Sequence, residues 1–166
     1  MKKMLLLSFI FLFFTGCSLE EIDNTPTKQV EAFLNNYQTL DKKVIDDLDL
    51  VVAKETEYTN KQKEKYKDIL KKHYQNLTYE IKDETVNGNK ATVEVEIEVT
   101  DFYNALNNDS DKFDNYIDKK LDLLDKAKDR VKYTLNLELT KNKEKKWILE
   151  DLSYDDEQKI LGMYKY

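Results

Sequence analysis

Three stretches of the chain alternate between apolar and polar residues, and this period of two residues most restricts the possible folds. They are Leu77–Lys82, Val93–Val99 and Val131–Leu139. Such alternation is typical of β-strands that bury one face and expose the other to water. The apolar face of an antiparallel sheet needs a second layer to cover it, so the rest of the chain must supply that layer.

Helical periodicity before the first strand supplies this layer. Thr25 and Pro26 predict a helix start, because threonine caps free N–H groups and proline fits the first turn. Two more helices are expected to open at Asp41 and Asn60. The apolar faces of the three helices are Val30, Phe33, Leu34 and Tyr37, then Val44, Ile45, Leu48, Val51 and Val52, then Tyr66, Ile69, Leu70, His73 and Tyr74.

The dipeptide Asn87–Gly88 separates the first two predicted strands and indicates a β-hairpin. A two-residue loop there would set Ile81 opposite Glu94 and place one of them on the wrong face. A three-residue loop over 87–89 sets Ile81 opposite Val95. We predict the three-residue loop, because a slip by one residue exchanges the core and solvent faces.

The remaining segments predict one inserted helix, one strand and a short tail. A helix over 110–129, capped by Asp109 and Ser110, follows the second strand. Trp147–Leu152 is expected to form a fourth strand that is apolar on both faces, and 155–166 one short helix. The predicted fold class is α+β, with N-terminal helices on one face of a curved antiparallel sheet and an extra helix between the second and third strands.

The N-terminus carries a signal of another kind. Lys2 and Lys3 precede an apolar run at 4–14, which is shorter than the roughly 20 residues of a membrane span and fits a secretory signal peptide. The run ends in Phe14-Thr15-Gly16-Cys17, which resembles the lipobox of bacterial lipoproteins. The resemblance implies a diacylglyceryl group on Cys17, which with its two acyl chains would anchor the protein stably. The alternative is an uncleaved signal anchor.

These features divide the chain into three parts. Residues 1–16 are the expected signal peptide, 17–25 the lipidated cysteine and a tether, and 26–166 a single α+β domain. The expected location is the outer face of the bacterial cytoplasmic membrane, reached through the lipid anchor.

The order of the predicted elements is similar to the cone-shaped nuclear transport factor 2-like fold, as in small lipoproteins of low-GC Gram-positive bacteria. The resemblance rests on Val30–Leu34 in the first helix, on the hairpin at Asn87–Gly88 and on Lys146–Leu149 before Asp151–Ser153. It implies a cavity between the sheet and the helices, which the helix at 110–129 would alter or close. It implies no single function, because one fold serves many.

Aromatic side chains on the apolar faces are the expected lining of that cavity. Core packing is the plainer interpretation, since tyrosine supplies bulk and its hydroxyl reaches the rim. The other interpretation is a pocket for a small apolar ligand. The candidate lining residues are Tyr37, Tyr66, Tyr79, Tyr133 and Trp147.

Composition excludes several classes of function. The formal net charge is −6 and Arg130 is the only arginine, so we expect no nucleic-acid partner. One cysteine and one histidine exclude structural zinc. The acidic stripe of Glu94, Glu96 and Glu98 is expected on a solvated sheet face, balanced by lysines such as Lys82. A charged outer face argues against an apolar dimer interface, so we expect a monomer.

Two further features are candidate sites of chemistry. His73 is interpreted as a structural histidine, because no acid–base motif accompanies it. Asn107 begins a spacing like that of a calcium loop, but Lys112 stands where the loop needs glycine and Asp118 where it needs glutamate. We therefore expect no catalytic residues, no metal and no cofactor.

The sequence predicts a membrane-anchored extracytoplasmic lipoprotein that acts as a non-catalytic binding or accessory domain with a small cavity. Its partner would be a small apolar ligand or an envelope protein. The alternative is a structural or immunity-type envelope protein that acts through its charged surface. An enzyme that uses the cavity is the third hypothesis.

Overall fold

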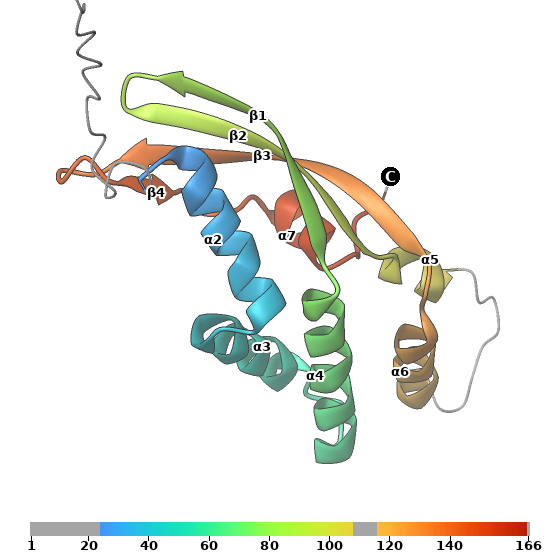
Figure 1. Ribbon diagram of the computed structural model, residues 1–166. Coiled ribbons are helices and arrows are strands. Elements are labelled where there is room, and N and C mark those ends of the chain that lie inside the picture. Colours follow the sequence, from blue (N-terminus) through green and yellow to red (C-terminus); the bar gives the residue numbers. More distant parts are fainter. Residues whose placement is uncertain (1–23, 108–115, 166) are drawn as a thin grey trace, which may run out of the picture.

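The computed structural model describes residues 24–107 and 116–165. The predicted α+β class is confirmed, with a curved four-stranded antiparallel sheet in the order β1-β2-β3-β4 (Figure 1). The predicted signal peptide, Cys17 and the helix caps Asp109 and Ser110 lie outside the described residues. The elements are α2 (Pro26–Thr39), α3 (Lys42–Lys54), α4 (Asn60–Gln75), β1 (Thr78–Asn87), β2 (Lys90–Thr100), α5 (Phe102–Asn107), α6 (Tyr116–Lys126), β3 (Arg130–Lys141), β4 (Trp147–Leu149) and α7 (Tyr154–Ile160).

The three predicted helix starts before the sheet are confirmed. The Thr25 side chain accepts a hydrogen bond from the backbone N–H of Lys28, and Pro26 occupies the first turn of α2. The side chain of Asp41 caps α3 in the same way. At α4, Thr59 and Gln62 form a reciprocal capping box.

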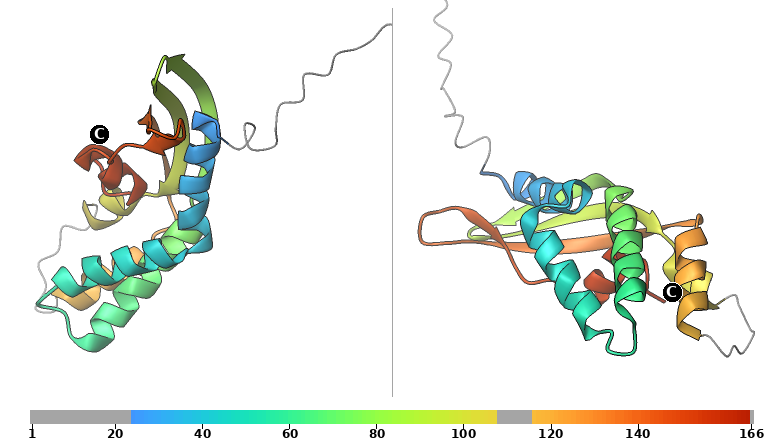
Figure 2. Two further views of the ribbon diagram at one scale, coloured as in Figure 1. Left: turned by 90° about the vertical axis from the view of Figure 1, so that its left-hand side faces the viewer. Right: turned by 90° about the horizontal axis from the view of Figure 1, so that it is seen from below.

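One face of the sheet carries the helices and the other carries none of those described (Figures 1 and 2). The covered face packs against Val30 and Leu34 of α2 and against Ile160 of α7. The strand residues that point toward these helices are the predicted ones, Val93, Val95, Ile97, Val99, Tyr133, Leu135, Leu137 and Leu139 among them.

The hairpin between β1 and β2 differs from the predicted one in its loop. Ile81 does pair with Val95, but Asn87 pairs with Lys90, so the loop has two residues rather than three. A β-bulge between Ile81 and Asp83 inserts one extra residue into β1, and this residue brings Ile81 opposite Val95 despite the shorter loop. The strand therefore changes which of its residues face the helices, a local event that alternation alone does not reveal.

The buried side chains form two clusters, so the three predicted helices do not all cover the sheet as expected. Phe33 and Tyr37 of the first apolar helix face pack on the sheet, but Leu48 and Tyr66 of the next two faces do not. α4 is 16 residues long, roughly 24 Å, and only its last turn reaches the sheet. Its first turns pack against other helices, which together form the second cluster. That cluster contains Leu48, Val52, Tyr58, Tyr66, Ile69, Leu70, Phe102, Leu121 and Leu124.

The end of the chain also departs from the predicted pattern. β4 is only three residues long, and Ile148 is exposed, so the strand is not apolar on both faces. The tail helix is present as α7, capped by Ser153. In the described ranges, no helix is both long and apolar enough to cross a membrane.

Candidate functional site

Three of the five predicted lining residues are core residues. Tyr66, Tyr133 and Trp147 are each 4% exposed. The Tyr133 hydroxyl donates to the carbonyl of Tyr164 at 3.0 Å, and the Lys141 ammonium lies 4.6 Å from the centre of the Trp147 ring. These side chains pack closely against their neighbours, as buried aromatic rings usually do.

The other two, on α2 and β1, are partly buried and pack against the sheet cluster. Tyr37 packs edge-on against Phe33 and Tyr74, and burial raises the pKa of its hydroxyl to about 12. The Tyr79 hydroxyl donates to Asn35 at 3.1 Å. Tyr66 belongs to the second cluster while the other four belong to the sheet, so the structure does not bring the five together.

Four hollows of about 510, 320, 180 and 120 Å³ are lined by described residues. Of the five predicted lining residues, only Tyr79 borders one of them, the hollow of about 180 Å³. The two largest hollows lie where β4 ends beside β3, and we consider them first as a candidate site.

These two hollows adjoin and share three acidic side chains, Glu138, Glu150 and Asp151. We call the pair the acidic groove. The backbone N–H of Glu150 donates to the carbonyl of Glu138 at 2.9 Å, which brings the two glutamates together across the sheet edge. The remaining lining residues are Lys90, Ala91, Thr92, Asn136, Leu137, Leu139, Thr140, Leu152, Ser153 and Asp156.

One acidic member of the groove is held in place by a neighbouring strand. The Thr140 hydroxyl donates to the Glu150 carboxylate at 2.7 Å. At the far end of the groove, Asp156 pairs with Lys159 at 3.1 Å and also accepts from Ser153. Glu138 and Asp151 are exposed, so the groove presents negative charge and polar side chains to water. Such a surface suits a cationic segment.

No local sequence pattern indicates this groove. Glu138 is an outward-facing residue of β3, and Glu150 directly follows β4. Only the pairing of Leu139 with Leu149 places the two glutamates side by side. The turn after β3 sets the register of the two strands that it joins.

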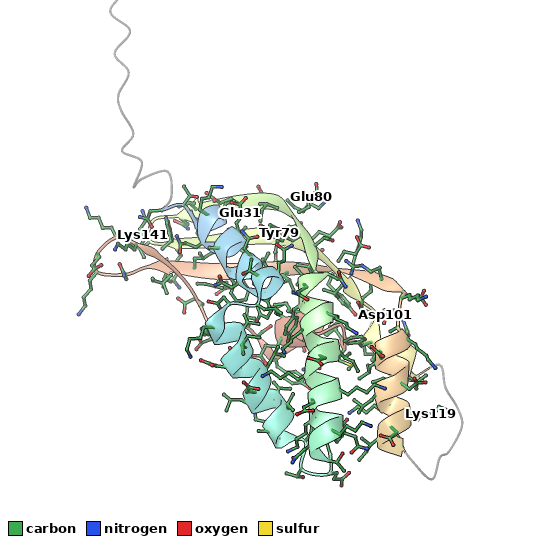
Figure 3. The ribbon with its side chains drawn as sticks, turned by 60° about the horizontal axis from the view of Figure 1, so that its bottom comes forward. Glu31, Tyr79, Glu80, Asp101, Lys119 and Lys141 are labelled. Atoms are coloured by element: carbon green, nitrogen blue, oxygen red, sulfur yellow. The ribbon has the colours of Figure 1, made fainter. Side chains whose placement is uncertain are left out.

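Two of the three glutamates of the acidic stripe on β2, Glu96 and Glu98, lie beside cationic side chains. Glu96 lies 2.8 Å from Lys132 and 3.7 Å from Lys82, and Arg130 lies 3.4 Å from Glu98. The hydrogen bond from Lys132 lowers the pKa of Glu96 below its usual value. Figure 3 shows Glu80 on this same outer side of the sheet, where Lys82 pairs with it at 2.6 Å. Because Glu96 and Glu98 lie beside cationic side chains, part of the negative charge of the stripe is compensated.

His73 lies at the junction of the two clusters. Its Nε2 donates to the Ile160 carbonyl at 2.8 Å, and its ring stacks on Phe102 at 4.6 Å. Nδ1 is buried without a hydrogen-bond partner among the described residues. Burial lowers the pKa of His73 to about 4, so the ring is neutral at pH 7. A neutral histidine that donates to a backbone carbonyl, with no carboxylate partner, has the geometry of a structural residue.

A hollow of about 120 Å³ borders His73 but has no set of groups suited to metal binding. Among the described residues, no three histidine, cysteine or acidic side chains could hold a metal ion together. The carboxylate of Asp118, from the calcium-like spacing, accepts a hydrogen bond from Gln62 at 2.7 Å. The positions 109 and 111 of that spacing lie outside the described residues.

Comparison with protein-family models, with curated proteins and with solved structures finds no match to this chain. The resemblances to bacterial lipoproteins and to the nuclear transport factor 2-like fold stay predictions, carried by the residues that suggested them.

Proposed function

We propose that the chain is a lipid-anchored extracytoplasmic protein whose domain is a non-catalytic module that binds an envelope protein through the acidic groove. The anchor rests on one observation, that the only cysteine follows a short apolar run and the pair Thr15-Gly16. Attachment at that point would leave a domain of ordinary size outside the membrane.

The choice of a surface over an apolar cavity rests on the packing of the interior. Tyr66, Tyr133 and Trp147, three of the five candidate lining residues, are enclosed by other side chains. The larger hollows are polar and open onto the outer edge of the sheet, with exposed carboxylates at their border. This arrangement supports a basic, extended segment of a partner protein as the ligand.

The anchor is tested by replacing the cysteine in the full chain. We expect Cys17→Ser to abolish lipid attachment, measured by mass spectrometry, and to move the protein out of the washed membrane fraction. Ser18→Ala is the matched control and should behave like the wild type. A Cys17→Ser protein that is still processed before residue 17 and stays with the membrane would contradict the lipoprotein assignment.

The groove is tested by removing two of its charges. Glu150→Gln with Asp151→Asn should lose a partner that the wild-type protein cross-links in intact cells. Glu64→Gln with Glu94→Gln changes the net charge equally at exposed positions outside the groove and should retain that partner. The cross-linked segment of the partner should be rich in lysine or arginine. Equal capture by both double variants would remove the groove from the proposal.

A further inference from the structure

The end of the molecule nearest the proposed tether is positively charged, although the chain as a whole is acidic. The segment from the last residue of β3 onward reads Lys-Asn-Lys-Glu-Lys-Lys over 141–146, with Glu144 as its single acid. Lys90, the first residue of β2, lies at the same end. We call Lys90, Lys141, Lys143, Lys145 and Lys146 the lysine face.

A set of hydrogen bonds holds this face in a fixed shape. The side chain of Asn142 accepts from the backbone N–H groups of Glu144 and Lys146 at 2.9 and 3.0 Å, which closes the turn. The backbone N–H of Lys141 donates to the carbonyl of Asn89 at 2.9 Å and so joins the two hairpins. Lys90, Lys143, Lys145 and Lys146 are exposed on this framework.

The first described residue of the domain is bound to the same turn. The Asn24 side chain donates to the carbonyl of Lys145 at 3.1 Å and accepts from the backbone N–H of Trp147 at 3.0 Å. The start of α2 and the hairpin of β3 and β4 therefore lie at one end of the molecule (Figures 1 and 2), and Figure 3 shows Lys141 at this end.

The length of chain between the anchor and this point restricts where the lysine face lies. Cys17 is seven residues before Asn24. Even fully extended, seven residues span at most about 25 Å. A domain anchored at Cys17 therefore keeps Asn24, and with it the turn that carries most of the lysine face, within about 25 Å of the anchor point.

We propose that the lysine face binds the anionic headgroups of the membrane and orients the domain with this end down. The inference rests on the proposed lipid anchor. Clusters of four or more lysines held beside a bilayer are attracted to anionic lipids, and the attraction adds to that of an acyl anchor. In this orientation the outer face of the sheet stands beside the membrane rather than against it, and Lys90 lies where the lysine face meets the acidic groove.

The test uses the full lipidated protein in vesicles and Trp147, the only tryptophan, as the reporter. Vesicles of phosphatidylcholine, with or without phosphatidylglycerol, carry a trace of lipid with a dansyl headgroup. Energy transfer from Trp147 to the dansyl group reports how close this end lies to the surface. We expect more transfer in the anionic vesicles, and we expect the excess to disappear at 1 M salt, where the screening length is about 3 Å.

A charge-matched pair of variants assigns the effect to this face. Lys143→Gln, Lys145→Gln and Lys146→Gln together should abolish the excess transfer and leave the contact of Lys141 with Trp147 unchanged. Lys43→Gln, Lys54→Gln and Lys61→Gln, at exposed positions of α3 and α4, remove the same charge and should preserve it. Circular dichroism checks that each variant is folded.

The outcomes separate the two proposals. If Cys17 carries lipid but transfer is the same in neutral and anionic vesicles, or the two triple variants behave alike, the lysine face is overturned and the anchor stands. If Cys17 carries no lipid, both the anchor and the orientation that depends on it are overturned.

Discussion

At the scale of single residues, His73 is the position where burial and charge are most directly opposed. Its side chain is 2% exposed, and only one of its two ring nitrogens forms a hydrogen bond, to the carbonyl of Ile160. Protonation would place a positive charge in this site, and Arg130 adds a further unfavourable interaction. The fold therefore holds the ring in its neutral form.

This burial predicts a loss of stability in mild acid. His73 has a pKa of 6.5 in the unfolded chain and of about 4 in the folded chain. Its contribution to the free energy of unfolding is therefore fully present above pH 6.5 and is lost as the pH falls toward 4. At pH 5 the free energy of unfolding in urea should be lower by about 2 kcal/mol than at pH 7.5.

Because the chain has one histidine, a single variant provides the control. His73→Gln should be less stable at pH 7.5, since it disturbs the packing against Phe102, but its stability should change little between pH 7.5 and 5. An equal fall in the wild type and the variant would assign the acid sensitivity to carboxylates instead.

At the scale of elements, the bulge in β1 connects the hairpin to the first helix. Beyond the bulge, Glu84 pairs with Val93 and so shares the helix-facing side of the sheet. Its carboxylate accepts from the backbone N–H of Thr27 at 2.9 Å and from the Thr27 hydroxyl at 2.6 Å. A carboxylate at the N-terminus of α2 interacts favourably with the helix dipole.

Neutralising this carboxylate should weaken the contact between the hairpin and the helix. We expect Glu84→Gln to lower the free energy of unfolding by about 1 kcal/mol, with part of the effect removed by salt. Glu94→Gln, on the neighbouring strand, changes the same charge without a helix N-terminus and should stay close to the wild type. Thermal unfolding at low and high salt compares the two, and equal stabilities would exclude the proposed role of Glu84.

At the scale of the whole molecule, the C-terminal segment joins the two hydrophobic clusters. Ile160 and Tyr164 pack with the sheet, whereas Leu161 and Met163 pack with the helices. Gly162 stands between them, and its carbonyl accepts from the backbone N–H of Tyr103 at 2.9 Å. At this residue the backbone passes very close to Thr100 of β2.

A side chain at Gly162 should therefore destabilise the whole domain. A Cβ there would stand 2.1 Å from the backbone oxygen of Thr100, and the φ of +70° also favours glycine. We expect Gly162→Ala to cost at least about 2 kcal/mol of unfolding free energy.

The second described glycine supplies the control. Gly88 has a similar φ of +61°, but a Cβ there meets nothing within 4 Å, so Gly88→Ala should cost only about 1 kcal/mol of backbone strain. Hydrogen exchange should show that Gly162→Ala weakens both β3 and α6, while Gly88→Ala affects only its own hairpin. Similar losses in both variants would mean that the close approach to Thr100 carries no energy of its own.

The sequence alone determined the features that depend on neighbouring residues along the chain. Alternation assigned the buried and exposed faces of β2 and β3, because successive side chains of a strand point to opposite sides. Thr25, Asp41 and the segment at 59–60 marked the helix starts, because a cap satisfies N–H groups two or three residues away. The same local pattern around Cys17 predicts the lipid anchor.

Only the tertiary structure decided which distant segments meet. The length of α4 carried Tyr66 past the sheet into a second cluster, and the bulge after Ile81 turned Glu84 toward α2. The acidic groove and the lysine face likewise join side chains from separate strands and turns. Periodicity records how each segment divides its own residues between water and the interior, but the partner that covers each apolar face is set by packing across the whole chain.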